Sequence, residues 1–202
     1  MSAPVELRLL GGVLAGGASR RLGRDKSVER VGRDRMVDRA VRALNHVCEE
    51  VVVVSSRADA PSGPWRVVPD RRESVGPLSG IEAALTEARN LGYHAVFVLA
   101  CDLPLVGPAL ATSVVDALGG ADASAPGRVG VPGFEPLCAV YRTACLEVAT
   151  ALLDRGERAA HMLFGSIDGR RIDVAGDAVL NVNTEADLAR ARALAEGGGV
   201  DR

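Results

Sequence analysis

The amino-acid sequence predicts an α/β fold in which helices cover both faces of one mostly parallel β-sheet. Short apolar runs alternate with segments of helical periodicity along the chain. This alternation is typical of βαβ units joined by right-handed crossovers. A chain of 202 residues can bury the core of one such domain without disulfides or a structural metal. We therefore expect a single three-layer α/β/α domain.

The N-terminal half shows the clearest alternation of strands and helices. The apolar run 7–15 predicts a buried strand that feeds directly into the glycine-rich turn 16–19. The segment 76–80 is expected to be a rigid loop that leads into a helix. The other strands expected here cover 51–54, 65–68 and 95–100. One helix is expected to begin at Met36, and a second to cover 81–89.

The C-terminal half predicts fewer regular elements. Pro108 suits the first turn of a helix, because its missing N–H needs no partner there. Thr184 is a good N-cap for a last helix over 185–196. The domain is expected to span 1–196, and the glycine-rich end 197–202 to be a disordered tail. Strands over 136–141 and 170–174 and a helix over 143–153 complete the prediction.

Composition argues against several classes of protein. The 24 basic and 26 acidic residues leave a net charge of -2. This balance does not predict the broad cationic surface that duplex nucleic acid requires. Aromatic residues make up 3% of the chain, so base-stacking platforms are not expected. Neither a signal peptide nor a membrane-spanning segment is predicted, and the four cysteines are scattered. We expect a soluble, cytoplasmic protein with no nucleic-acid or membrane partner.

A glycine loop surrounded by cations follows the first predicted strand. Backbone amides of small residues can approach phosphate oxygens without a Cβ clash. Arg20, Arg21, Arg24 and Lys26 bring positive charge to the same loop, although its spacing fits neither the dinucleotide motif nor the P-loop. A plain turn with solvated arginines is the alternative. We favour a triphosphate site, because strand, glycines, cations and a downstream acid coincide.

That downstream acid is Asp102, which follows the predicted strand 95–100. In open α/β sheets the carboxyl ends of the strands line the ligand crevice. A carboxylate oxygen at this place is a natural Mg²⁺ ligand, and the metal would orient the α-phosphate for in-line attack. A turn or N-cap role explains Asp102 equally well on its own. The glycine loop favours the metal-binding role.

Four segments, taken in order, resemble the motifs of the molybdenum cofactor guanylyltransferases. They are LAGGASRRLGRDK over 14–26, GPLSG over 76–80, CDLP over 101–104 and NVNT over 181–184. Each is weak alone, but together they span nearly the whole chain. The resemblance implies a Rossmann-like nucleotidyltransferase fold. It also implies transfer of GMP from Mg-GTP to the phosphate of molybdopterin, with release of pyrophosphate.

The resemblance further implies which residues hold the nucleotide. Asp102 would bind both Mg²⁺ and the nucleotide, while Asp70 would accept hydrogen bonds from guanine. A solvated turn residue beside Pro69 is an equally good interpretation of Asp70. The remaining residues expected at the nucleotide are Leu14, Ala15, Gly16, Gly17, Lys26, Gly76, Pro77 and Gly80.

The same resemblance implies an acceptor side and a catalytic set. Asn181, Asn183 and Arg158 would line the molybdopterin side. Charge stabilisation by Lys26, Asp102 and Arg21 is expected to do most of the catalytic work, because direct displacement needs no covalent enzyme intermediate. The expected partners are therefore GTP and molybdopterin, together with molybdoenzymes or their chaperones.

Other functions stay open at this point. Cytidylyl transfer, or transfer to a sugar phosphate, uses the same glycine-loop chemistry, although Gly16 and Gly17 after Ala15 favour the guanylyl branch. A catalytically idle GTP-binding maturation adaptor is a further alternative, against which the presence of Asp102 and Lys26 argues. The resemblance implies that Glu135 lies in a segment near the active site, but a turn into a strand explains it equally well, and Glu135 is not assigned to the site.

Overall fold

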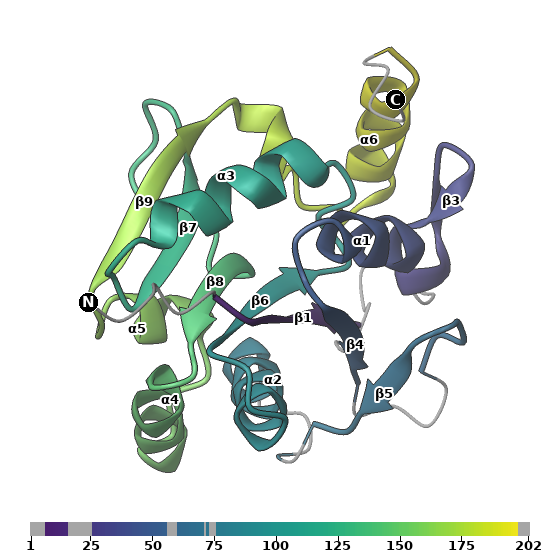
Figure 1. Ribbon diagram of the computed structural model, residues 1–202. Helices are drawn as coiled ribbons and strands as arrows, with labels where there is room; N and C mark the ends of the chain where they lie inside the picture. Colours follow the sequence, from purple (N-terminus) through teal and green to yellow (C-terminus); the bar gives the residue numbers. More distant parts are fainter. Residues whose placement is uncertain (1–6, 16–25, 56–59, 71, 73–75, 198–202) are drawn as a thin grey trace.

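A seven-stranded sheet forms the centre of the protein, with the strand order β5-β4-β1-β6-β8-β7-β9 (Figure 1). The computed structural model describes residues 7–15, 26–55, 60–70, 72 and 76–197. β8 runs antiparallel to β6 and β7, and the other pairings of this sheet are parallel. The predicted mostly parallel sheet is thus confirmed. Its strands are β1 (Leu9–Leu14), β4 (Glu50–Val54), β5 (Arg66–Val68), β6 (Ala95–Ala100), β7 (Ala123–Arg128), β8 (Cys138–Arg142) and β9 (Gly169–Val174).

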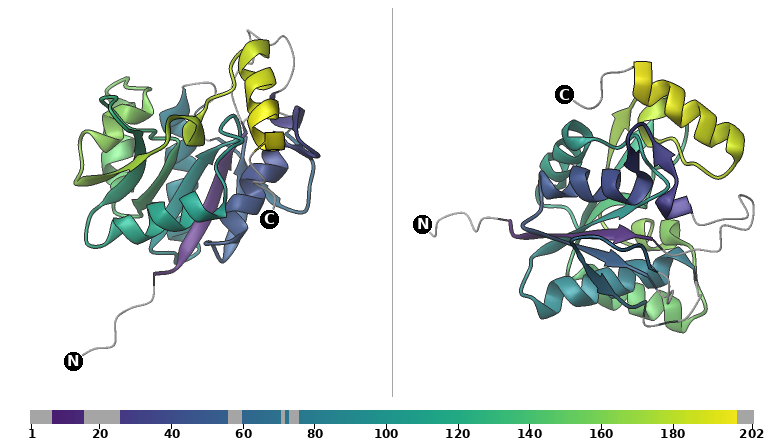
Figure 2. Two further views of the ribbon diagram at one scale, coloured as in Figure 1. Left: turned by 90° about the horizontal axis from the view of Figure 1, so that it is seen from above. Right: turned by 90° about the vertical axis from the view of Figure 1, so that its right-hand side faces the viewer.

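Helices cover both faces of this sheet, which gives the three expected layers (Figure 2). α1 (Met36–Asn45) and α3 (Pro108–Leu118) pack on one face. The other face carries α2 (Pro77–Asn90), α4 (Cys145–Asp154) and the short α5 (Ala160–Phe164). The smaller elements are η1 (Lys26–Val28), β2 (Arg30–Val31), β3 (Asp34–Arg35), η2 (Gly176–Val179) and α6 (Glu185–Gly197).

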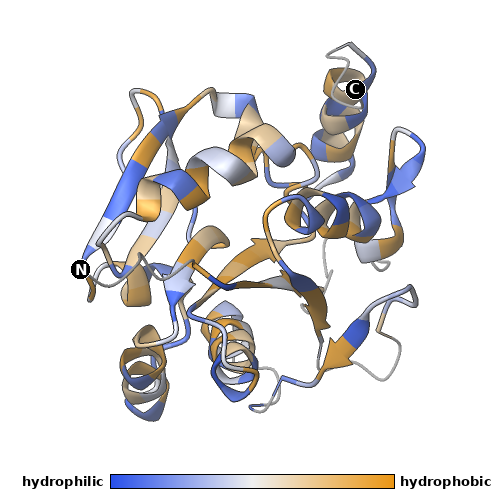
Figure 3. Cartoon of the chain, viewed as in Figure 1, coloured by the Kyte–Doolittle hydropathy of each residue, from blue (hydrophilic) through white to orange (hydrophobic). Residues whose placement is uncertain are grey.

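The central strand β1 is buried along its whole length, and its side chains alternate between the two faces. Leu10 packs with α2 and Val13 with α1. A Cβ at Gly12 would lie 3.0 Å from the Cβ of Ala84, so the glycine lets α2 approach the strand closely. β6 and, after Glu50, β4 are likewise apolar, as the orange colouring of most of their length in Figure 3 shows. No helix in the described part of the chain is long and apolar enough to cross a membrane.

The start of α2 corrects one sequence prediction. The segment 76–80 is not a loop before the helix, because α2 begins at Pro77 and only Gly76 precedes it. Proline is favoured at the first helical position, where its fixed φ suits the helix and no N–H is needed. The two glycines of the segment had suggested a loop, yet Gly80 lies inside the helix and packs on Leu14.

The C-terminal half contains both confirmed and missed elements. Thr184 caps α6 as predicted: its Oγ1 accepts the N–H of Asp187 at 3.1 Å, and its own N–H donates to the Asp187 carboxylate at 2.9 Å. β7 was missed, since Pro126 and Gly127 are poor strand formers. α5 and the β2–β3 hairpin were missed as well. α6 ends at Gly197, and the rest of the predicted tail lies outside the described residues.

Candidate active site

The carboxyl edge of the sheet brings several predicted site segments together around the end of β1. The carbonyl of Leu14 accepts the N–H of Cys101 at 3.1 Å, and the N–H of Ala15 donates to the carbonyl of Val54 at 3.0 Å. The chain therefore leaves β1 between the ends of β4 and β6, where ligands bind in open α/β sheets. Lys26 begins η1 just downstream. The predicted site residues Gly16, Gly17 and Arg21 lie outside the described residues.

Asp102 lies at this edge directly after β6, with its Oδ1 atom buried. Its carbonyl oxygen accepts the N–H of Val182 at 2.8 Å. That bond brings the segment of Asn181 and Asn183 next to Asp102, and the side-chain amide of Asn183 donates to Oδ1 of Asn181 at 2.9 Å. The sequence separates these residues by about eighty positions, and only the fold brings them together.

Glu135, which is not among the predicted site residues, also reaches this edge. The antiparallel pairing of β8 with β6 returns the chain here, since the N–H of Ala100 donates to the carbonyl of Leu137 at 2.8 Å. Burial raises the pKa of Glu135. The hydrogen bond from the N–H of Leu137 lowers that pKa, and the negative charge of Asp102 raises it. Glu135 is thus a second carboxylate within electrostatic reach of Asp102.

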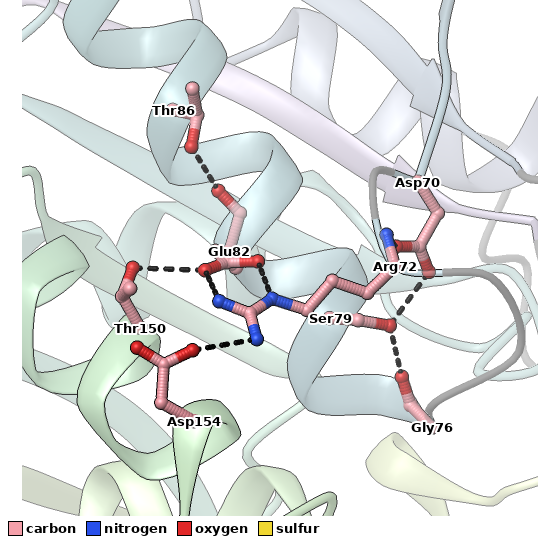
Figure 4. Close-up of polar contacts among 8 residues, drawn as sticks. All are labelled: Asp70, Arg72, Gly76, Ser79, Glu82, Thr86, Thr150 and Asp154. Carbon is pink, nitrogen blue, oxygen red and sulfur yellow. Dashed lines mark hydrogen bonds and ion pairs between the residues drawn. The ribbon is translucent and has the colours of Figure 1, made fainter.

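Asp70 is tied to the start of α2 (Figure 4). Its Oδ2 accepts a hydrogen bond from Oγ of Ser79 at 2.7 Å, and its Oδ1 accepts the N–H of Arg72 at 3.1 Å. The residue is half-buried rather than fully solvated. Each carboxylate oxygen can accept two hydrogen bonds, so Asp70 keeps acceptor capacity for a ligand.

The segment 76–80 connects β1 with the chain before α5. The methyl groups of Leu14 would lie 3.3 Å from a Cβ at Gly80, so α2 packs directly on the end of β1. The N–H of Leu78 donates to the carbonyl of Arg158 at 3.2 Å. The structure therefore places Arg158 at the start of α2, whereas Asn181 and Asn183 lie beside Asp102.

Comparison with known proteins identifies the family of this chain. The family model described as a MobA-like NTP transferase domain matches residues 11–169. The chain belongs to this family. It is 34% identical to a probable molybdenum cofactor guanylyltransferase of Pelotomaculum thermopropionicum, over 94% of this chain and 95% of the relative. It is 32% identical to a molybdenum cofactor guanylyltransferase of Desulfosudis oleivorans, over 92% and 95% of the two chains. The resemblance seen in the sequence is confirmed.

A solved structure from Archaeoglobus fulgidus supports the MobA-like fold. It is described as molybdopterin-guanine dinucleotide biosynthesis protein A and superimposes with a TM-score of 0.76 at 21% identity. The superposition covers 93% of this chain and 98% of the other. The region matched by the MobA-like family model contains Lys26, Asp70 and Asp102, while Asn181 and Asn183 lie beyond its end.

The half-buried carboxyl of Glu135 leads to a prediction about pH. Its pKa is raised in the folded state. Its contribution to stability is therefore present at low pH and is lost as the pH rises through the folded pKa. Glu135→Gln is expected to be more stable than the unchanged protein at pH 8, and the difference should shrink towards pH 5.

Urea unfolding at both pH values, with EDTA present, measures this difference. Glu196→Gln is a suitable control, because Glu196 is exposed near the end of α6. A pH-independent difference for Glu135→Gln would contradict the prediction.

Proposed function

We propose that this protein is a molybdenum cofactor guanylyltransferase. It moves GMP from GTP to the terminal phosphate of molybdopterin and releases pyrophosphate. The observation that carries this proposal is the convergence at one sheet edge of the end of β1, Asp102 and the segment 181–183. The names of the two relatives support the same reaction.

The nucleotide is proposed to lie along the carboxyl edge of β5, β4, β1 and β6. Asp70 follows β5 and Asp102 follows β6, which are separated by three strand spacings, or about 14 Å. That separation suits the two ends of a nucleotide. Asp70 would accept the N1–H and amine protons of guanine, and Lys26 with the loop after β1 would face the phosphates.

The residues beside Asp102 suit a magnesium ion. Asp102 supplies a carboxylate, and the nearby Asn181 and Asn183 supply amide oxygens, which are the hard ligands that Mg²⁺ prefers. When bound, Mg²⁺ would neutralise phosphate charge and polarise the α-phosphate. We propose Asp102 as its protein ligand.

The reaction itself requires orientation more than acid–base chemistry. An oxygen of the acceptor phosphate forms a bond to the α-phosphorus of GTP as the bond to the bridging oxygen breaks. The electron pair leaves with pyrophosphate. Lys26 and Arg21 would stabilise the developing charge. Asn181 and Asn183 would position the acceptor beside Asp102, and Arg158 would contact it from the α2 side.

A nucleotide competition assay tests the proposal. The full chain is incubated with molybdopterin, Mg²⁺ and GTP, CTP or ATP, and pyrophosphate release is measured. We expect GTP to be preferred by about tenfold or more, and EDTA to abolish release. A CTP preference would favour the cytidylyl alternative. Tight GTP binding without pyrophosphate release would favour the idle adaptor.

The setting of the reaction is also part of the proposal. All four cysteines lie among the described residues, and none is in a disulfide there. This agrees with a reducing cytoplasm, where molybdoenzymes or their chaperones would receive the product.

A further inference from the structure

A polar cluster joins the Asp70 segment to α2 and α4 (Figure 4). We call Arg72, Glu82, Thr150 and Asp154 the Arg72 clamp. Nε and Nη2 of Arg72 donate to the two carboxylate oxygens of Glu82 at 2.9 and 3.1 Å. Thr150 on α4 donates to the same carboxylate at 2.9 Å, and Nη1 of Arg72 pairs with Asp154 at 2.8 Å. The clamp thus connects the Asp70 segment, α2 and α4.

The chemistry of the clamp makes it rigid. Glu82 is 7% exposed, and a buried carboxylate is costly unless its oxygens are paired and hydrogen-bonded. The planar guanidinium of Arg72 matches both oxygens at once, which fixes its orientation as well as its charge. The hydrogen bonds that Arg72 donates to Glu82, and then to Asp154, raise the pKa of Arg72. The paired contact with Glu82 therefore defines the position of the Arg72 side chain against α2.

This position determines where the carboxylate of Asp70 points. The backbone N–H of Arg72 donates to Oδ1 of Asp70, while Oγ of Ser79 on α2 contacts Oδ2. One oxygen of Asp70 is thus fixed to α2 directly, and the other is fixed through Arg72. Loosening the contact between Arg72 and Glu82 would free one of these two restraints.

We propose that the ion pair between Arg72 and Glu82 is a positioning device that orients Asp70 towards the guanine edge of the nucleotide. The inference rests on the proposed function, in which Asp70 accepts hydrogen bonds from guanine. Neither clamp residue needs to touch the nucleotide. The device acts on selectivity for the base, because a misplaced Asp70 no longer matches the N1–H and the amine together.

Inosine triphosphate is the probe for this role, because its base lacks the exocyclic amine of guanine. Glu82→Gln replaces one accepting oxygen with an amide that cannot accept from Arg72. The preference for GTP over inosine triphosphate in kcat/KM is expected to fall by about fivefold. KM for GTP should rise, and kcat should stay within about twofold, because the reacting atoms are untouched.

Two further variants make the test decisive. Arg72→Lys retains the charge but loses the paired contact, so it should reduce the preference as Glu82→Gln does. Glu87→Gln is the matched control, since Glu87 lies on the same helix and pairs with Arg66 outside the clamp. Its preference should match that of the unchanged protein. Melting temperatures of all variants separate stability from selectivity.

The outcomes distinguish this inference from the proposed function. Suppose that the unchanged protein prefers GTP over inosine triphosphate and that both clamp variants keep this preference. The positioning role is then overturned, whether or not the melting temperature of the variants is lower. If the unchanged protein itself shows no preference for GTP in binding measured by calorimetry, the guanine role of Asp70 fails, and the inference fails with it.

Discussion

Asp102→Asn is expected to lower guanylyl transfer by about two to three orders of magnitude while leaving the fold intact. The substitution replaces a charged oxygen that would hold Mg²⁺ with a neutral amide, so charge on the α-phosphate is no longer neutralised. The fold should survive, because the bond from Val182 goes to the backbone carbonyl of Asp102 and not to its side chain.

The turnover number with saturating Mg²⁺, GTP and molybdopterin measures this effect, and the melting temperature reports on folding. Asp116→Asn on the exposed side of α3 is the control, because it removes the same charge far from the edge. Titration with Mn²⁺ in the presence of GTP gives a readout that does not depend on turnover. Unchanged turnover and Mn²⁺ affinity would show that Asp102 has no metal-binding role.

The central strands could be predicted from the sequence because their signal is local. β1, β4 and β6 are buried on both faces, so each reads as a continuous apolar run. The position of Asp102 followed from β6, since the residue after a parallel strand must lie at the carboxyl edge. The glycine motif and the resemblance predicted a nucleotide site, and the family-model match confirms the family.

The missed elements depend on partners that are distant in the chain. β7 contains Pro126 and Gly127, yet it forms a strand because β8 and β9 pair with its two edges. Glu135 reaches the site only because β8 runs antiparallel to its neighbours. Neither fact has a signature in the local sequence.

The contacts that hold the predicted site residues also depend on tertiary packing, so the sequence does not predict them. The resemblance predicts a role for Asp70, whereas the sequence places Ser79 in an expected loop and has no local sign that Arg72 contacts α2. Their roles appear only when α2 is placed against the end of β5, which brings the hydroxyl of Ser79 to Asp70. Sequence motifs thus identify candidate binding residues, and the tertiary structure identifies the side chains that contact them.

Gly76→Ala is expected to damage both stability and nucleotide binding. Gly76 has φ 105° and ψ -179°, a conformation that is essentially restricted to glycine. A Cβ there would also lie 3.0 Å from the carbonyl oxygen of Arg158, which accepts the N–H of Leu78. The substitution is expected to cost roughly 1–3 kcal/mol, which corresponds to a fall of about 3–10 °C in melting temperature.

Gly92→Ala separates the two causes of this loss. Gly92 also has a positive φ, 76°, but no atom lies within 4 Å of a Cβ placed there. Backbone strain alone should therefore lower its melting temperature less than Gly76→Ala does, and its GTP affinity should not change. For Gly76→Ala, relief of the clash requires the start of α2 or the Arg158 backbone to move. The contact between Ser79 and Asp70 should weaken as a result, and calorimetry should show lower GTP affinity. Equal GTP affinity in the two variants would mean that the start of α2 does not shape the nucleotide site.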